Sequence, residues 1–393
     1  PVDHQLLNQD GYHLNLLVMI HIPYTYSEGL FFYSLFYVTA VIVGVAGAAL
    51  VARKQGISLS AFAVVVAVGI LTLLIGSKWI IFDPQQWNVL FGEGRLPQET
   101  GKSILGAMLG GVIGIWAAAR MLGIRHSILD LFAVSFPLGM AVQRIGCLLA
   151  GCCHGILTSQ TCSLAYGPES KLFAKQANMG LLSPDAISTL PVHPNQLYNI
   201  LGCTLIAIVV WKTWSYWKAP GAKFLFSVML YLGLRFLEEF TRASLEPEYW
   251  MGLKVIQWKL MLVMIKLIPL LALLEYRHRH QDRPALKPYV PNLQQRMKGV
   301  ILGLITLIFI LNFKDWFTTD ERTIIAFVMF PLAGLSVISN GLHLLSTNSW
   351  LKKFSLFLLG LLMMSQSDDS SNYGDKSYTA FNFTTTFGRF TLD

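Results

Sequence analysis

Long stretches of apolar residues alternate with short polar stretches along most of this 393-residue chain. A helix needs about 20 mostly apolar residues, with about 17 as the lower end, to cross the hydrocarbon core of a bilayer. The strict alternation typical of barrel strands is absent from these stretches. The pattern therefore predicts spanning helices at 31–51, 59–76, 103–120, 130–151, 197–213, 222–241, 257–275, 299–313 and 323–345.

One further apolar run, at 354–364, is short for a membrane span. We therefore expect an all-α polytopic membrane protein, with a seven-helix core plus two or three extra C-terminal transmembrane helices. The predicted organisation is a seven-helix domain at 1–276 with an outer insertion at 152–196, a basic cytoplasmic linker at 277–298, additional helices at 299–365, and a polar extramembrane tail at 366–393.

The composition and the charge distribution agree with this class and add an orientation. Hydrophobic residues make up 54% of the chain and charged residues 13%, against about 25% charged in soluble domains. Half of the 30 Lys and Arg lie in five short loops, and none precedes Arg53. The positive-inside rule therefore places the N-terminus outside and these loops in the cytoplasm. The net charge of +8 forms no basic helix face, so we expect no nucleic-acid partner.

Two arginines lie inside predicted membrane helices, which is an expensive place for a charge. Arg144 follows a long apolar run, and Arg235 precedes Glu238 and Glu239 in RFLEEFTR. An ionisable residue at such a place costs about 2.5–3.5 kcal/mol on insertion scales and is commonly functional. Arg235 and Glu239 are four residues apart and share a helix face. One interpretation is an ion pair that joins helices; the other is an anion site for a phospholipid phosphate.

Four cysteines and a histidine cluster in and after the fourth predicted helix: Cys147, Cys152, Cys153, His154 and Cys162. The C-x4-C-C-H-x7-C spacing differs from the paired C-x2-C pattern of a zinc site, so no metal ligand is assigned and no cofactor is expected. On the oxidising outer side, Cys152 or Cys153 could form a disulfide with Cys162. Buried or free thiols, a metal site and a nucleophilic thiol also remain open.

The stretch PVHPNQLYN at residues 191–199 precedes the fifth predicted helix. Its prolines and Asn195 suit a capping turn, and Tyr198 suits the membrane interface. Alternatively, His193 transfers a proton or orients a lipid head group, with Gln196 beside it.

RIGCLLAGCCHG at 144–155, HPNQLY at 193–198 and RFLEEFTR at 235–242 together resemble the prolipoprotein diacylglyceryl transferase family. The resemblance covers residues 31–276. It implies transfer of a diacylglyceryl group from phosphatidylglycerol to the lipobox cysteine of a preprolipoprotein, at the outer face of the bacterial inner membrane.

The resemblance also implies roles for individual residues. Arg144, Arg235 and Glu239, with His193 and His154 as candidate proton acceptors, would be catalytic. The expected substrate-binding residues are Gly146, Gly155, Gln196, Tyr198, Tyr33 and Arg242.

Three positions differ from the family pattern. Cys147 stands where the family has Asn, Cys152 replaces an acidic residue, and Leu105 stands where the family has His. An alternative is therefore a non-catalytic homologue, a lipid-binding subunit whose C-terminal extension docks onto partners in a membrane complex. Transport is disfavoured, because no pair of broken helices occurs at matching places in two halves.

Overall fold

The computed structural model describes residues 18–93, 97, 103–125, 127–159, 162–243, 248–279 and 288–347. The predicted run 354–364, the tail 366–393 and the first 17 residues lie outside these ranges. The part of the chain up to Asn340 forms one compact unit, and a second unit begins at Gly341.

All nine predicted spans are helices. They are α1 (Tyr26–Lys54), α2 (Leu59–Trp79), α4 (Ile104–Met121), η3 (Leu129–Phe132) with α5 (Ser135–Leu149), α7 (Asn195–Lys212), α8 (Ala222–Glu238), α9 (Val255–Arg279), α10 (Leu293–Asn312), and α11 (Thr319–Ile324), which continues through η5 (Ile325–Met329) into α12 (Phe330–Thr347). Within the described residues, six of these spans are long and apolar enough to cross a membrane. The protein is therefore an all-α polytopic membrane protein.

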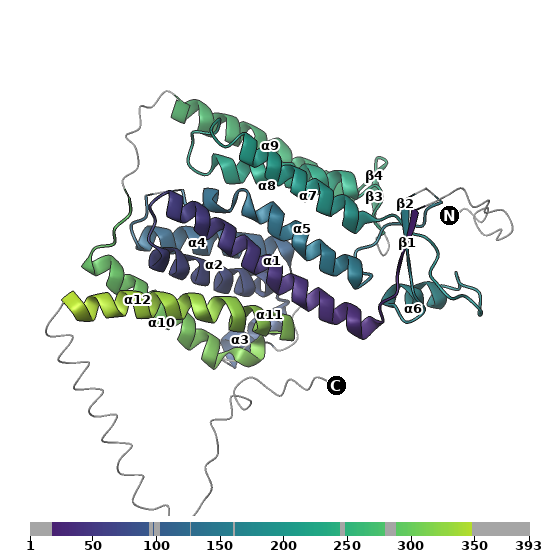
Figure 1. Ribbon diagram of the computed structural model, residues 1–393, viewed down its shortest axis with the longest axis horizontal. Helices are drawn as coiled ribbons and strands as arrows, with labels where there is room; N and C mark the ends of the chain where they lie inside the picture. Colours follow the sequence, from purple (N-terminus) through teal and green to yellow (C-terminus); the bar gives the residue numbers. More distant parts are fainter. Residues whose placement is uncertain are drawn as a thin grey trace, which may run out of the picture. The chain divides into compact units, whose positions relative to one another are not determined.

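Helices α1, α2, α4 and α5 form the central group, and α7, α8 and α9 run side by side next to it (Figure 1). Helices α2 and α4 approach closely because Gly106, Gly110 and Gly114 of α4 lie against α2. A Cβ atom at Gly106 would lie 2.1 Å from the Gly76 carbonyl oxygen, and one at Gly110 would lie 2.2 Å from that of Thr72. Small residues at this spacing allow close packing of membrane helices.

A small mixed element covers the end of α5. Strand β1 (Val18–Ile22) pairs in parallel with β2 (Cys162–Tyr166), so that Ile22 lies opposite Tyr166. Helix α6 (Lys171–Asn178) packs on this pair through the buried Leu172. The Tyr166 hydroxyl donates to the Leu148 carbonyl at 3.0 Å and so fixes the element to α5. The hydropathy pattern had predicted an insertion here without its strands or α6.

Two short helical elements, a hairpin and a docked linker complete the unit. Helix α3 (Pro84–Gly92) follows α2, the turn η4 (Lys314–Trp316) precedes α11, and β3 (Tyr249–Trp250) pairs with β4 (Leu253–Lys254) in a hairpin. Tyr289 holds the end of the basic linker against two turns. Its amide donates to the Gly56 carbonyl between α1 and α2, and its hydroxyl donates to the Leu122 carbonyl at the end of α4. Burial raises the pKa of Tyr289 to about 12.

Candidate active site

Gly146 positions the signature segment by bringing α5 against α1. A Cβ atom there would lie 2.9 Å from the Phe36 Cβ atom and 3.1 Å from the Tyr33 Cα atom. The Tyr33 ring stacks on that of Tyr37, with 6.0 Å between the ring centroids. Two of the expected substrate-binding residues, Gly146 and Tyr33, therefore lie at the α1–α5 contact, and Gly146 is two residues after Arg144 in α5.

The Arg144 guanidinium group has an N–H donor that makes no hydrogen bond with the described residues. Its Nη1 atom lies 3.6 Å from the Cys147 sulfur, while its Nε atom is buried and has no hydrogen-bond partner among the described residues. A buried donor without a partner is uncommon and points to a missing ligand or water. Arg144 lines a small pocket with six other side chains: Cys153, Asn195, Gln196, Asn199, Glu238 and Arg242.

Two guanidinium groups therefore face the same pocket, those of Arg144 and Arg242. Glu238 is the only carboxylate among the residues that line it, and the Asn199 amide donates to this carboxylate at 2.6 Å. Each guanidinium group carries several N–H donors in a planar fork that suits phosphate oxygens. The excess of positive charge makes the pocket suitable for an anion.

Arg235 is held differently. Its guanidinium group pairs with Glu239 and lies 3.7 Å from the Glu238 carboxylate. Glu239 also lies 3.5 Å from the Lys254 ammonium group, which donates to the carbonyl oxygens of Glu239 and Arg242. The ion pair predicted between Arg235 and Glu239 is thus present, and Arg235 does not line the pocket described above. Its expected contact with phosphate remains a prediction.

The three sequence motifs meet at Gly155. Its amide donates to the His193 carbonyl at 2.9 Å, and its backbone forms an antiparallel bridge with Arg242. The next amide, that of Ile156, donates to the Thr241 carbonyl. There is no room for a side chain, because a Cβ atom at Gly155 would lie 2.3 Å from the His193 Cβ atom and 2.7 Å from the Thr241 oxygen. This close approach of three backbone segments places Arg242 beside Arg144.

We expect Gly155→Ala to displace these segments. Overpacking of a tight contact costs about 1–3 kcal/mol of folding free energy, and a misplacement of about 1 Å lowers a reaction rate by up to about 100-fold. Thermal unfolding in detergent and an activity assay measure the two effects. Gly92→Ala is the matched control, because a Cβ atom at Gly92 meets nothing within 4 Å. Full activity of Gly155→Ala would contradict the role of the close approach.

The two histidines lie beside the pocket and do not line it. The His154 Nδ1 atom donates to the Gly155 carbonyl at 2.9 Å, which leaves Nε2 as the proton acceptor. His193 Nδ1 lies 3.4 Å from the Tyr198 hydroxyl. Burial lowers the pKa of both imidazoles, so both are neutral at pH 7. Either could accept a proton, but neither is placed within the pocket itself.

Gln196 fixes the loop that follows α5. Its side-chain amide donates to the Cys152 carbonyl at 2.7 Å and lies 3.3 Å from the Tyr166 hydroxyl. Asn195, which the sequence suggested as a helix cap, is instead the first residue of α7, and its side chain accepts a hydrogen bond from the Thr241 hydroxyl at 2.7 Å. Pro194 occupies the capping position and makes no side-chain cap.

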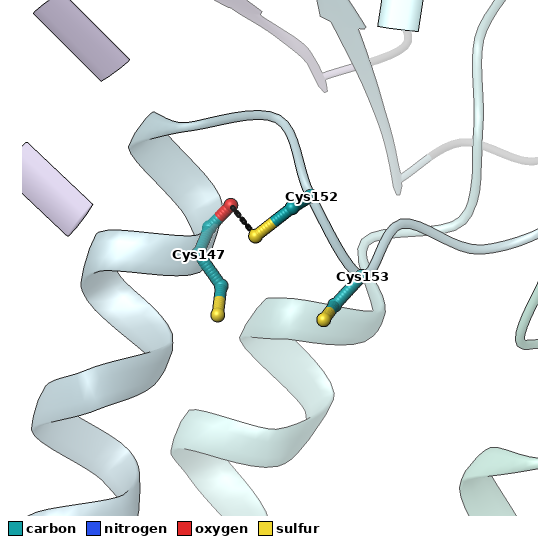
Figure 2. A group of neighbouring side chains, drawn as sticks. All are labelled: Cys147, Cys152 and Cys153. Atoms are coloured by element: carbon teal, nitrogen blue, oxygen red, sulfur yellow. Dashed lines mark hydrogen bonds between the residues drawn. The ribbon is translucent and has the colours of Figure 1, made fainter. Parts of the chain in front are cut away.

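The cysteines are all free, so of the alternatives that the sequence left open, the disulfide to Cys162 is not formed. Cys162 is exposed on β2, whereas the sulfur atoms of Cys147, Cys152 and Cys153 lie within 4.8 Å of one another. The Cys152 thiol donates to the Cys147 carbonyl oxygen (Figure 2). Hydrogen bonds from the Cys147 and Cys152 thiols, with Arg144 and Arg242 nearby, hold the pKa of Cys153 well below its ordinary value. Hydrogen bonds to its two neighbours and burial raise the pKa of Cys152.

The roles that the resemblance implies leave out four residues that line the pocket: Cys153, Asn195, Asn199 and Glu238. The sequence singled out Cys153 as a thiol and Glu238 as a carboxylate in a membrane helix, but assigned neither to this pocket. Two signals could have found three of them: Asn195 and Asn199 are four residues apart on one face of an otherwise apolar helix, and Glu238 is an acid in another.

An apolar cavity of about 340 Å³ lies next to this site. Side chains of α1, α2, α4 and α5 line it, including the small residues Ala107 and Gly111 of α4. Gln143 lines the same cavity, and the next residue, Arg144, lines the polar pocket. An apolar chamber and an anion pocket are thus adjacent along one helix.

Comparison with known proteins agrees with this arrangement. The model of a family described as prolipoprotein diacylglyceryl transferase matches residues 24–273. The chain belongs to this family. The match covers the transferase region from the start of α1 to α9, and it leaves α10 to α12 outside.

Three curated relatives are named phosphatidylglycerol–prolipoprotein diacylglyceryl transferase. The relative from Dehalococcoides mccartyi is 26% identical over 191 residues, which cover 48% of this chain and 66% of the relative. Those from Clostridium tetani and Neisseria gonorrhoeae are 29% and 32% identical over 45% and 39% of this chain, covering 66% and 56% of the relatives. The chain thus spans about two thirds of the first relative's length.

Proposed function

We propose that this protein transfers the diacylglyceryl group of phosphatidylglycerol to the thiol of a prolipoprotein cysteine. Family membership and the names of the relatives support this reaction class. The observation that carries the proposal is the pocket in which Arg144, with its unpartnered buried Nε atom, faces Arg242. A phosphate held by two arginines is the recognition feature that the substrate head group requires.

The adjoining apolar cavity supplies the other half of lipid recognition. With the phosphate between Arg144 and Arg242, the glycerol carbons lie near Gln143, and an acyl chain can enter the space lined by α1, α2, α4 and α5. Burying an acyl chain contributes about 0.8 kcal/mol per CH₂ relative to water, although the bilayer offers the same gain. In this proposal the cavity therefore adds little binding free energy over the bilayer, and its main effect is to orient the lipid.

The arginines also suit the chemistry of the transfer. The acceptor thiol attacks the glycerol carbon, the carbon–oxygen bond to phosphate breaks, and glycerol phosphate leaves. The leaving phosphate gains negative charge as this bond breaks, so fixed cations stabilise the transition state more than the bound substrate. Glu238 and Asn199 keep the guanidinium group of Arg144 in place in this proposal.

We place the reaction at the outer face of the bacterial inner membrane. The charge distribution of the loops supports this orientation, since it puts the end of α5 and the β1–β2–α6 element on the outer side. The prolipoprotein would reach the site from that side. Partner docking through the C-terminal extension has no support from the comparisons, and its tail lies outside the described residues.

Complementation tests the proposal. The full chain is expressed in bacteria depleted of their own diacylglyceryl transferase, and lipidation of a reporter lipoprotein is followed by gel shift and mass spectrometry. We expect rescue by the wild-type chain and none by Arg242→Ala. Lys212→Ala, an exposed cation at the end of α7, is the control and should rescue fully. No lipidation by a well-expressed, membrane-inserted wild-type chain would favour the non-catalytic alternative.

A further inference from the structure

Three cysteines from one signature segment converge at the edge of the pocket. Cys147 lies in the last turn of α5, and Cys152 and Cys153 follow in the loop (Figure 2). Their sulfur atoms all lie within 4.8 Å of one another. The sequence spacing had spoken against a metal site, because it lacks a pair of C-x2-C elements. The turn between Cys147 and Cys153 brings the three sulfurs together in spite of that spacing.

The separation of the sulfurs fits a metal ion. Zinc binds thiolates at about 2.3 Å in tetrahedral geometry, which places neighbouring sulfurs about 3.8 Å apart. Small side-chain rotations that shift each sulfur by up to about 1 Å bring the three thiols to that spacing. The turn is already shaped for this purpose: Cys153 has a φ of 59°, in the left-handed region that a residue with a side chain rarely adopts. This conformation directs the Cys153 sulfur toward that of Cys147 (Figure 2).

The surroundings of Cys147 suit a coordinating thiolate. The Gln143 side-chain amide donates to its sulfur at 3.1 Å, and the Arg144 guanidinium group donates at 3.6 Å. Groups that donate to a ligand atom fix its orientation and stabilise its charge, and they tune metal affinity. Three thiolates and one Zn²⁺ carry a net charge of −1, which Arg144 and Arg242 compensate.

We propose that Cys147, Cys152 and Cys153 bind a zinc ion whose fourth position receives the thiol of the acceptor protein. This inference rests on the proposed function and names how its nucleophile is activated. Three protein ligands with one open position are typical of catalytic zinc, whereas structural zinc has four. His154 is not among the groups that meet at this point, so the described residues leave the fourth position to the pocket that Cys153 lines.

The step balances without any oxidant or reductant. The acceptor thiol loses its proton to water on binding the metal, as zinc-bound thiols do. The thiolate attacks the terminal glycerol carbon of the diacylglyceryl group, and a carbon–sulfur bond forms. The carbon–oxygen bond to phosphate breaks, and its electron pair stays with glycerol phosphate, which takes up one proton. Arg144 and Arg242 face the phosphate in the same pocket, so nucleophile and leaving group meet there.

Cobalt substitution tests the site directly. The full chain is purified in detergent under reducing conditions, stripped with a chelator, and titrated with Co²⁺ and then Zn²⁺. We expect about one cobalt ion per chain, with thiolate-to-cobalt absorption in the near ultraviolet that zinc abolishes. Cys147→Ser and Cys153→Ser should each lose this absorption. Gln143→Leu, which leaves all three ligands in place, should weaken zinc binding by about 10–100-fold.

The two remaining cysteines provide matched controls. Cys162 is exposed on β2 and Cys203 is buried in α7, and neither belongs to the cluster. Cys162→Ser and Cys203→Ser should therefore keep the absorption. Stoichiometric cobalt bound without thiolate absorption, or absorption that persists in Cys147→Ser, would overturn the site.

A lipobox peptide separates this inference from the proposed function. A peptide with Cys at the acceptor position should change the cobalt spectrum, and the same peptide with Ser should not. A chain that transfers lipid yet binds no metal, or keeps its full rate after chelation, refutes the zinc site and leaves the transferase intact. A disulfide among Cys147, Cys152 and Cys153 in mass spectra of the active protein would also refute it. Thiolate-bound cobalt in a chain that transfers no lipid supports the site and refutes the transferase.

Discussion

Arg144→Ala is expected to lower the rate of diacylglyceryl transfer by about 100- to 1000-fold, because it removes a preorganised donor to the leaving phosphate. Arg144 is one of two guanidinium groups in the pocket, and its Nε atom has no other partner among the described residues. Negative charge develops on the phosphate as the carbon–oxygen bond breaks. The loss should therefore fall mainly on kcat, with a smaller rise in KM. Initial rates with phosphatidylglycerol vesicles and a lipobox peptide measure both.

Two further variants separate loss of charge from loss of geometry. Arg144→Lys keeps the positive charge next to Glu238 but cannot donate two parallel hydrogen bonds. It should fold normally and still lose much of the rate. Arg53→Ala removes an exposed arginine from the last turn of α1 and should leave the rate unchanged. If Arg144→Ala keeps the wild-type kcat, the phosphate is held elsewhere, with Arg235 as the next candidate.

The helices were predictable because a bilayer imposes one simple requirement on sequence. Apolar length alone located every described span. The helix ends differ from the predicted ends by a few residues where a helix continues into a polar segment, as at the starts of α1 and α10. The β1–β2 pair was not predictable in this way. It joins residues about 140 positions apart, and neither strand has enough alternation to stand out in a polar loop.

The site was predictable as a set of motifs but not as a geometry. Charge in an apolar helix identified Arg144 and Arg235, yet only the fold shows that Arg235 is paired with carboxylates while Arg242 faces the pocket. Linear spacing left a disulfide to Cys162 and free thiols as alternatives, and the structure has free cysteines. Cys153 has a left-handed backbone conformation, which no local pattern indicates, and its sulfur lies within 4.8 Å of that of Cys147.

Glu321→Gln is expected to lower the free energy of unfolding by about 3–5 kcal/mol, because it removes one charge of a buried ion pair. The Lys78 ammonium group at the end of α2 lies 3.0 Å from the Glu321 carboxylate, and both side chains are at most 3% exposed. Lys78 also donates to the Trp316 carbonyl and lies over its ring. Thermal and denaturant unfolding in detergent measure the loss.

The paired replacement Lys78→Met with Glu321→Leu should recover most of this stability, since an apolar pair of similar volume replaces a buried ion pair at little cost. Arg322→Ala breaks the exposed pair with Asp315 and should change stability by less than about 1 kcal/mol. A small effect of Glu321→Gln would mean that water reaches the pair.

A large effect of Glu321→Gln would also bear on the helices beyond the family match, because Lys78 lies in the matched region and Glu321 lies after it. A chain cut after residue 298 would lack the Glu321 carboxylate that pairs with Lys78, so a large effect would place α10 to α12 in the folding unit of the transferase.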